Sequence, residues 1–188
     1  MQRMEFLKSC ASGICLCTAV GLLSQESAPA QSGRTNPEAD PEKDELKWKL
    51  NAAQIRFAKL LQILNQNLDV PVKQKILQQV GADCSQSYRE LAAKYKGNLR
   101  GFLDYISTKW VEKAEYDEKA GTIRITDKAK QCTCPLVKPG VTPKDFCNCT
   151  LGWQKAIYSV VSGKPVEAEI EESILRGGAR CVFRIRIP

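Results

Sequence analysis

The fold is decided by residues 163–187, which read GKPVEAEIEESILRGGARCVFRIRI. Apolar residues alternate there with glutamates in the first half and with arginines in the second: Val166, Ala168 and Ile170, then Cys181, Phe183, Ile185 and Ile187. This alternation predicts two strands that each turn one face toward a core. Gly177-Gly178 between them predicts a turn, so the strands should pair antiparallel, with glutamates opposite arginines on the outer face.

A second pair of strands is expected earlier in the chain. Residues 110–117 alternate, Ala120-Gly121 predicts a turn, and residues 122–126 (TIRIT) return, which is typical of a β-hairpin. Between the two strand pairs, Thr150 can cap a helix that ends before Pro165.

The chain before these strands predicts helices. Asp40-Pro41 supplies an N-cap followed by proline at the first helical position. Apolar residues then recur every three or four positions: Leu46, Leu50, Ala53, Phe57, Leu61, Leu64 and Leu68. This stripe favours a long helix that packs on a core, and a coiled-coil or dimer helix is the alternative, which leaves a homodimer open. Shorter helices should follow from Pro71, Ser87 and Asn98, the first of them ending near Gly81.

Together these elements predict an α+β domain. The N-terminal helices would pack on a four-stranded antiparallel sheet, with one helix between two hairpin-like strand pairs. We expect a single domain over residues 40–188, helical over 40–108 and sheet-forming over 110–188, with a cysteine loop at 132–149.

Residues 1–30 predict an export signal peptide. Arg3 and Lys8 flank a charged start, residues 10–23 are small and apolar, and Ala28-Pro29-Ala30 matches a signal cleavage site. Because the apolar stretch is shorter than a membrane span, we expect no membrane association after cleavage.

Residues 2–8 (QRMEFLK) resemble the twin-arginine export signal of bacteria, although Met4 stands where its second arginine belongs. Either export route leads to a periplasmic or extracellular protein. Residues 31–39 are polar and rich in small residues, which predicts a disordered linker between signal and domain.

Composition excludes several functions. The net charge of +7 is dispersed, and no basic cluster of the kind that binds nucleic acid occurs, so we expect no nucleic-acid partner. The chain contains no histidine, which removes the usual general base and a common metal ligand. A cysteine nucleophile would therefore need an Asp, Glu, Lys or Tyr base, and a role other than catalysis is the better interpretation.

Two Cys-x-Cys pairs mark the chemical centre of the sequence, Cys132-Thr-Cys134 and Cys147-Asn-Cys149. The residues between them include three prolines and a glycine, which suits a loop that folds one pair onto the other. Four thiolates can surround zinc tetrahedrally or hold an iron–sulfur cluster, and Cys181 is a candidate further ligand. Disulfides between the pairs are the alternative in an oxidising compartment.

The C-terminal third resembles a known family. The matching positions are Cys147, Gly152-Trp153, Gly163 to Val166, Glu172-Ser173, Gly177-Gly178 and Cys181-Val-Phe183. This skeleton resembles the 4-vinyl-reductase domain and the related aminothiazoline-carboxylate hydrolase-like and Cys-rich bacterial families. The resemblance implies a small-molecule-binding sensor, often dimeric, in which some members hold zinc through cysteines and a glutamate. Cys147 and Cys181 match two such cysteine positions, whereas Ser173 replaces the third.

Three functions follow as hypotheses. The first is an exported domain that binds a metal, zinc by expectation, and holds a small molecule between helices and sheet. The second is an iron–sulfur protein or a cysteine-based, hydrolase-like enzyme. The third is a disulfide-stabilised interaction module without a cofactor.

Overall fold

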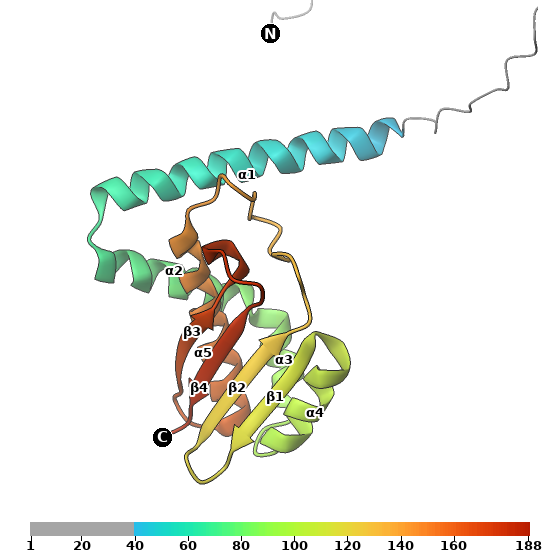
Figure 1. Ribbon diagram of the computed structural model, residues 1–188, viewed down its shortest axis with the longest axis vertical. Coiled ribbons are helices and arrows are strands. Elements are labelled where there is room, and N and C mark those ends of the chain that lie inside the picture. Colours follow the sequence, from blue (N-terminus) through green and yellow to red (C-terminus); the bar gives the residue numbers. More distant parts are fainter. Residues whose placement is uncertain (1–39) are drawn as a thin grey trace, which may run out of the picture. The chain divides into compact units, whose positions relative to one another are not determined.

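The structure is a computed structural model that describes residues 40–188; the predicted export signal and linker lie outside these residues. Four helices come first: α1 (Pro41–Asn67), α2 (Val70–Cys84), α3 (Gln86–Ala93) and α4 (Leu99–Lys109). Strands β1 (Val111–Asp117) and β2 (Thr122–Asp127), helix α5 (Asn148–Ser162), and strands β3 (Glu167–Glu172) and β4 (Val182–Arg186) follow (Figure 1). The α+β prediction is confirmed.

The four strands form one antiparallel sheet in the order β1-β2-β4-β3. Both predicted strand pairs are present, and Glu169 lies opposite Arg184 as expected, with an ion pair of 3.1 Å. The sequence does not predict the pairing of β2 with β4, which places Ile125 opposite Phe183. This pairing joins the two hairpin-like units into one sheet. The apolar faces of both units then contribute to one core.

The main core lies between the sheet and the helices that cover one of its faces (Figure 1). The inward residues of the central strands, Ile123 and Ile185, are fully buried. Helix α5 packs on them through Ile157 and Val161, and α4 contributes Phe102. The other face of the sheet is charged, so it needs no covering layer.

Helices α2 and α5 cross at very close range. A Cβ added at Gly81 would lie 1.7 Å from the carbonyl oxygen of Cys149, and one at Gly152 would lie 1.7 Å from that of Gln78. Helix α2 continues three residues past Gly81, near which the sequence analysis expects it to end. Glycine is present here because only a residue without a side chain allows two backbones to approach so closely.

The long helix α1 begins as predicted, because the Asp40 carboxylate accepts hydrogen bonds from the amides of Glu42 and Lys43 (3.2 and 3.3 Å). Its C-terminal half packs on a second, smaller core of Leu61, Leu77, Val137 and Phe146. The rings of Phe57 and Phe146 meet edge to face, 5.0 Å apart. Residues 41–50 are all exposed. No helix among the described residues is both long and apolar enough to cross a membrane.

Candidate functional site: a cluster of cysteines

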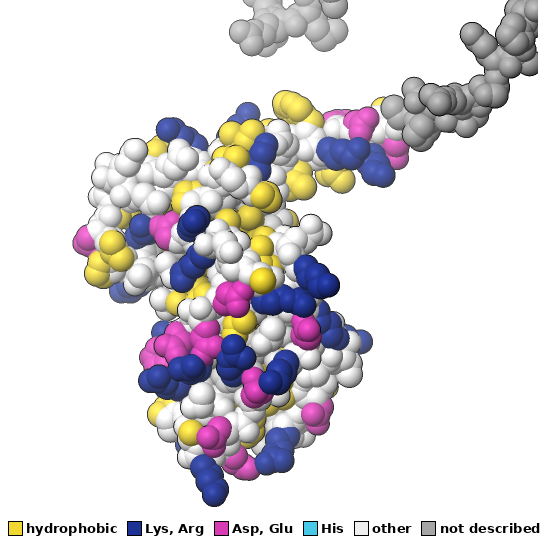
Figure 2. Space-filling view, in the orientation of Figure 1, with side chains coloured by type: hydrophobic (Ala, Val, Ile, Leu, Met, Phe, Trp, Pro, Cys, Tyr) yellow, Lys and Arg dark blue, Asp and Glu magenta, His cyan; other side chains and the backbone are white. Residues whose placement is uncertain are grey.

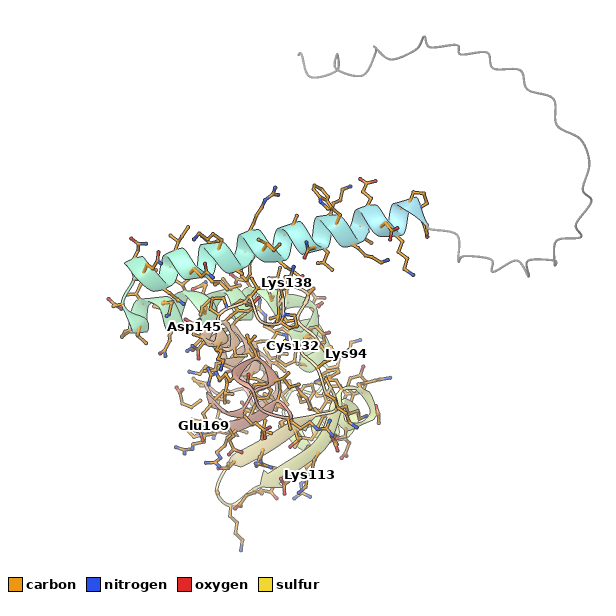
Figure 3. All side chains as sticks on the ribbon, turned by 45° about the horizontal axis from the view of Figure 1, so that its top comes forward. Lys94, Lys113, Cys132, Lys138, Asp145 and Glu169 are labelled. Atoms are coloured by element: carbon orange, nitrogen blue, oxygen red, sulfur yellow. The ribbon has the colours of Figure 1, made fainter. Side chains whose placement is uncertain are left out.

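The cysteine loop runs from β2 to a 3₁₀ turn at Lys144–Cys147 and is fastened to the helices. Gln54 Nε2 of α1 donates to the carbonyl oxygens of Pro135 (2.8 Å) and Val137 (3.2 Å). Lys138 reaches the same helix, where its Nζ donates to Asn51 (Figure 3). These bonds hold the loop between α1 and the rest of the domain, which limits how far its thiols can move.

The second Cys-x-Cys pair lies at the start of α5. The 3₁₀ turn continues directly into the helix, so Cys147 is the N-cap residue and Cys149 belongs to the first turn. Thr150 is therefore not the cap that the sequence suggests. Lys73 of α2 forms an ion pair of 2.7 Å with Asp145 in the 3₁₀ turn, which fixes this end of α5 against α2.

The two pairs come to the same part of the domain. Cys132 and Cys134 both raise the pKa of Cys147, and Cys134 and Cys147 both raise that of Cys149. Burial is the larger cause of both shifts. Cys132, Cys134 and Cys149 also pack against the second core.

The thiols are near one another without forming a ready-made metal site. All six cysteines within residues 40–188 are free thiols. In that same range, no group of three or more Cys, Asp or Glu side chains is placed to hold a metal ion. The zinc, iron–sulfur and disulfide expectations therefore stay predictions.

Sequence reasoning missed Cys84. This thiol ends α2, is exposed, and raises the pKa of both Cys134 and Cys149. The sequence did contain a signal for Cys84. Gly81 lies three residues before Cys84, so the two residues are on the same face of α2. Since that face contacts the backbone of Cys149, Cys84 is carried to the same place.

Cys181 belongs to the other edge of the cluster. Cys147 and Cys132 both raise its pKa. It directly precedes β4, and its carbonyl oxygen accepts a hydrogen bond from the Asp127 amide (3.0 Å). Ser173, in the neighbouring connection, lies with its Oγ 2.9 Å from Cys147 Sγ. The three positions on which the family resemblance depends, Cys147, Ser173 and Cys181, are thus close together in space.

Burial dominates the chemistry of these thiols. It raises the pKa of Cys134, Cys147 and Cys181, and it raises that of Cys149 to about 12. Ser173 and then Arg176 partly offset the shift at Cys147, where Arg176 Nη2 also donates to Asn148 Oδ1 (3.0 Å). Thiols with raised pKa values are protonated at neutral pH, which makes poor nucleophiles but leaves protons that a metal can displace.

A partly buried carboxylate, Asp127, lies beside this cluster. Burial raises the pKa of Asp127 to about 6. Burial also raises the pKa of Tyr158 on α5, and Asp127 adds to that shift. Asp127 is in turn one of the groups that raise the pKa of Cys181.

An open hollow elsewhere on the surface contains none of the cysteines. It lies on the charged outer face of the sheet, near the β1–β2 turn, and its lining includes Glu115, Arg124, Arg184 and Arg186. Arg124 bridges two acidic residues there, Glu115 at 3.3 Å and Glu171 at 2.6 Å. The charged side chains of this hollow thus pair largely with neighbouring charged side chains.

Comparisons with known proteins give a fold but no family. No family model matches the chain, and no curated protein matches it. One similar structure is trafficking protein particle complex subunit 3 from Naegleria fowleri, covalently bound to palmitic acid. Its TM-score is 0.50 at 15% identity, over 76% of this chain and 96% of that one. Another is the phenol-responsive sensory domain of the transcription activator PoxR with phenol, with a TM-score of 0.45, 13% identity and coverage of 70% and 73%. At such identities the chain is similar to the first of these in fold alone.

Proposed function

We propose that this chain is an exported metal-binding domain with a sensor-like or small-molecule-binding role, and that zinc is its ion. The proposed ligands are Cys132, Cys134, Cys147 and Cys149, with Cys181 as a further candidate. The observation that carries the proposal is that Cys132 and Cys134 pack against the same small core as Cys149, although a proline-rich loop separates the two Cys-x-Cys pairs.

The donor set suits zinc. Thiolates are soft ligands that zinc and iron–sulfur clusters accept, and a chain without histidine has few other nitrogen donors to offer. Protonated, half-buried thiols would each lose a proton on coordination, so affinity should rise with pH. Both ends and the middle of the cysteine loop are already held in place. Only a local rearrangement of the loop would therefore be needed to bring the four thiols around one ion.

A sensor-like role is supported by the family resemblance and by where its residues lie. Cys147, Ser173 and Cys181 are far apart in sequence, yet Ser173 contacts Cys147 and Cys147 influences Cys181. Enzymatic use of these thiols is disfavoured, because raised pKa values leave little thiolate near pH 7.

The test is metal analysis combined with thiol counting on protein purified without oxygen and without added metal. We expect about one zinc per chain and four thiols that react only after the protein is denatured in the presence of a chelator. Replacing Cys132 or Cys147 with Ser should abolish stoichiometric zinc. Cys84→Ser is the matched control, because it removes a neighbouring thiol outside the proposed ligand set and should leave zinc bound.

Other outcomes distinguish the alternatives. Visible absorption that is lost on reduction would replace zinc by an iron–sulfur cluster. A loss of free thiols in pairs, reversed by reductant, would make this a disulfide-stabilised module. Less than half an equivalent of metal together with reactive thiols in the folded protein would overturn the proposal.

A further inference from the structure

Exposed apolar side chains are concentrated on one part of the molecule. Of the eleven large hydrophobic residues that are exposed among residues 40–188, nine lie on α1 or α2. Leu46 and Trp48 are each 66% exposed and Leu50 is 46% exposed. Figures 1 and 3 both show the N-terminal half of α1 extending beyond the rest of the domain, and Figure 2 shows apolar side chains along it.

Leu46 and Leu50 continue a packed stripe, whereas Trp48 lies on the opposite face of α1. Leu46, Leu50 and Ala53 have the same spacing and the same helix face as Phe57 and the residues after it, which pack against the second core. The C-terminal half of this apolar stripe is therefore packed against the second core, whereas its N-terminal half is exposed to solvent. A bare stripe with alternating spacings of three and four has the form of a coiled-coil seam.

Residues 41–50, which are all exposed, are stabilised as a helix by interactions within α1 itself. Asp40 caps it, Lys47 pairs with Asp44 (2.9 Å), and Lys49 pairs with Glu45 (2.7 Å). Local pairs of this kind keep a short helix formed but do not cover its apolar face. The segment is thus preformed for a partner helix.

We propose that the occupant is a second copy of this chain, whose α1 packs antiparallel on the first, with the crossing near Trp48. Leu46 of one copy then lies opposite Leu50 of the other, so one seam covers both bare stripes. The arrangement is isologous, as in most homodimers, because the same surface serves both copies.

The charges on α1 favour the antiparallel direction. Glu42 and Arg56 are fourteen positions apart, two heptads, and therefore flank the seam on the same side. In an antiparallel pair centred near Trp48, Glu42 of each copy faces Arg56 of the other. In a parallel pair, acidic first turns would lie side by side. The lysines nearest the crossing are already ion-paired within their own helix.

The test is sedimentation of the full chain over a concentration series. A contact limited to about four turns of helix is smaller than a standard interface, so self-association should appear at micromolar concentrations. Leu50→Glu should weaken it at least tenfold. The matched control is Ile55→Glu, because Ile55 is equally exposed at 45% but lies on the opposite face of the same helix; association should remain.

Charge reversal tests the direction of the helices. Glu42→Arg and Arg56→Glu should each weaken association several-fold, and the double variant should recover it. A mixture of the two single variants should form heterodimers. A wild-type chain that stays monomeric at several hundred micromolar would overturn the proposal. So would equal loss in Leu50→Glu and Ile55→Glu, or binding to anionic vesicles without self-association, which would make a membrane surface the occupant.

Discussion

The sheet region and the cysteine region of this domain are held together by different means. The sheet encloses a core of thirteen buried residues, and β4 pairs with a strand on each side, β2 and β3. The second core has only four buried residues, and half-exposed thiols fill its margin. The first region is therefore closed by a large apolar core, whereas the second has a small core bordered by thiols.

The largest expected effect comes from the joint between the two regions. Gly152→Ala would place a methyl group 1.7 Å from the carbonyl oxygen of Gln78, so α2 and α5 would have to separate. We expect a loss of about 5 kcal/mol or failure to fold, which denaturant unfolding and expression yield would detect. Gly140→Ala, in open space but at positive φ, should cost only about 1 kcal/mol; equal losses would refute the close crossing.

The two cores should respond differently to the same truncation. Phe183 and Phe146 are both 3% exposed. Phe183→Ala leaves a cavity in the large core and should cost about 4 kcal/mol, whereas Phe146→Ala should cost less because the loose second core can collapse. Zinc should stabilise Phe183→Ala as much as the wild-type chain, because binding to the folded state stabilises any variant that keeps the site, and should stabilise Phe146→Ala less, because Phe146 packs beside the thiols. Thermal unfolding with and without zinc measures the stability of both variants. An equal gain in stability from zinc in the two variants would contradict the division into two regions.

A pH effect is expected where the regions meet. Burial raises the pKa of Asp127 from 3.8 to about 6. The unfolded chain therefore loses its proton first, and stability from this group, full below about pH 4, is lost as the pH rises through 6. Asp127→Asn should stabilise the protein at pH 7 by up to about 3 kcal/mol and have almost no effect at pH 3. Unfolding titrations at both values check this, and a variant less stable at pH 7 would disprove it.

The smallest effect is expected on the outer face of the sheet. Arg184 pairs with Glu169 at 3.1 Å, but both side chains are substantially exposed. Glu169→Gln should cost under about 1 kcal/mol, and the difference should shrink in high salt because exposed pairs are screened. A larger loss of stability that does not depend on salt would mean that these ion pairs stabilise the sheet and do not only set the register of its strands.

The sequence predicts the parts of the fold that depend on local patterns. Alternation in residues 163–187 identifies β3, β4 and their antiparallel pairing, and Asp40 and Asn98 cap helices as expected. The pairing of β2 with β4 was missed, because nothing in an alternating strand specifies a partner more than fifty residues away. Residues 1–39, with the export prediction, lie outside the described part.

The candidate site shows the same limit. Motif spacing found Cys132, Cys134, Cys147 and Cys149, which the fold does bring together. Cys84 has no partner nearby in sequence and joins them only because a glycine on its own helix face allows α2 to touch α5. Whether the thiols bind metal depends on sub-ångström positions of side chains, which residue spacing does not encode.

The central place of β4 has a consequence for how the domain is made. Both neighbours of this strand, β2 and β3, precede it in the chain. A nascent chain can close the β1–β2 turn early, but the sheet has an open edge on each half until residues 182–186 leave the ribosome. Assembly of the sheet should therefore wait until β4 is available, and a chaperone that shields exposed strand edges should raise the yield.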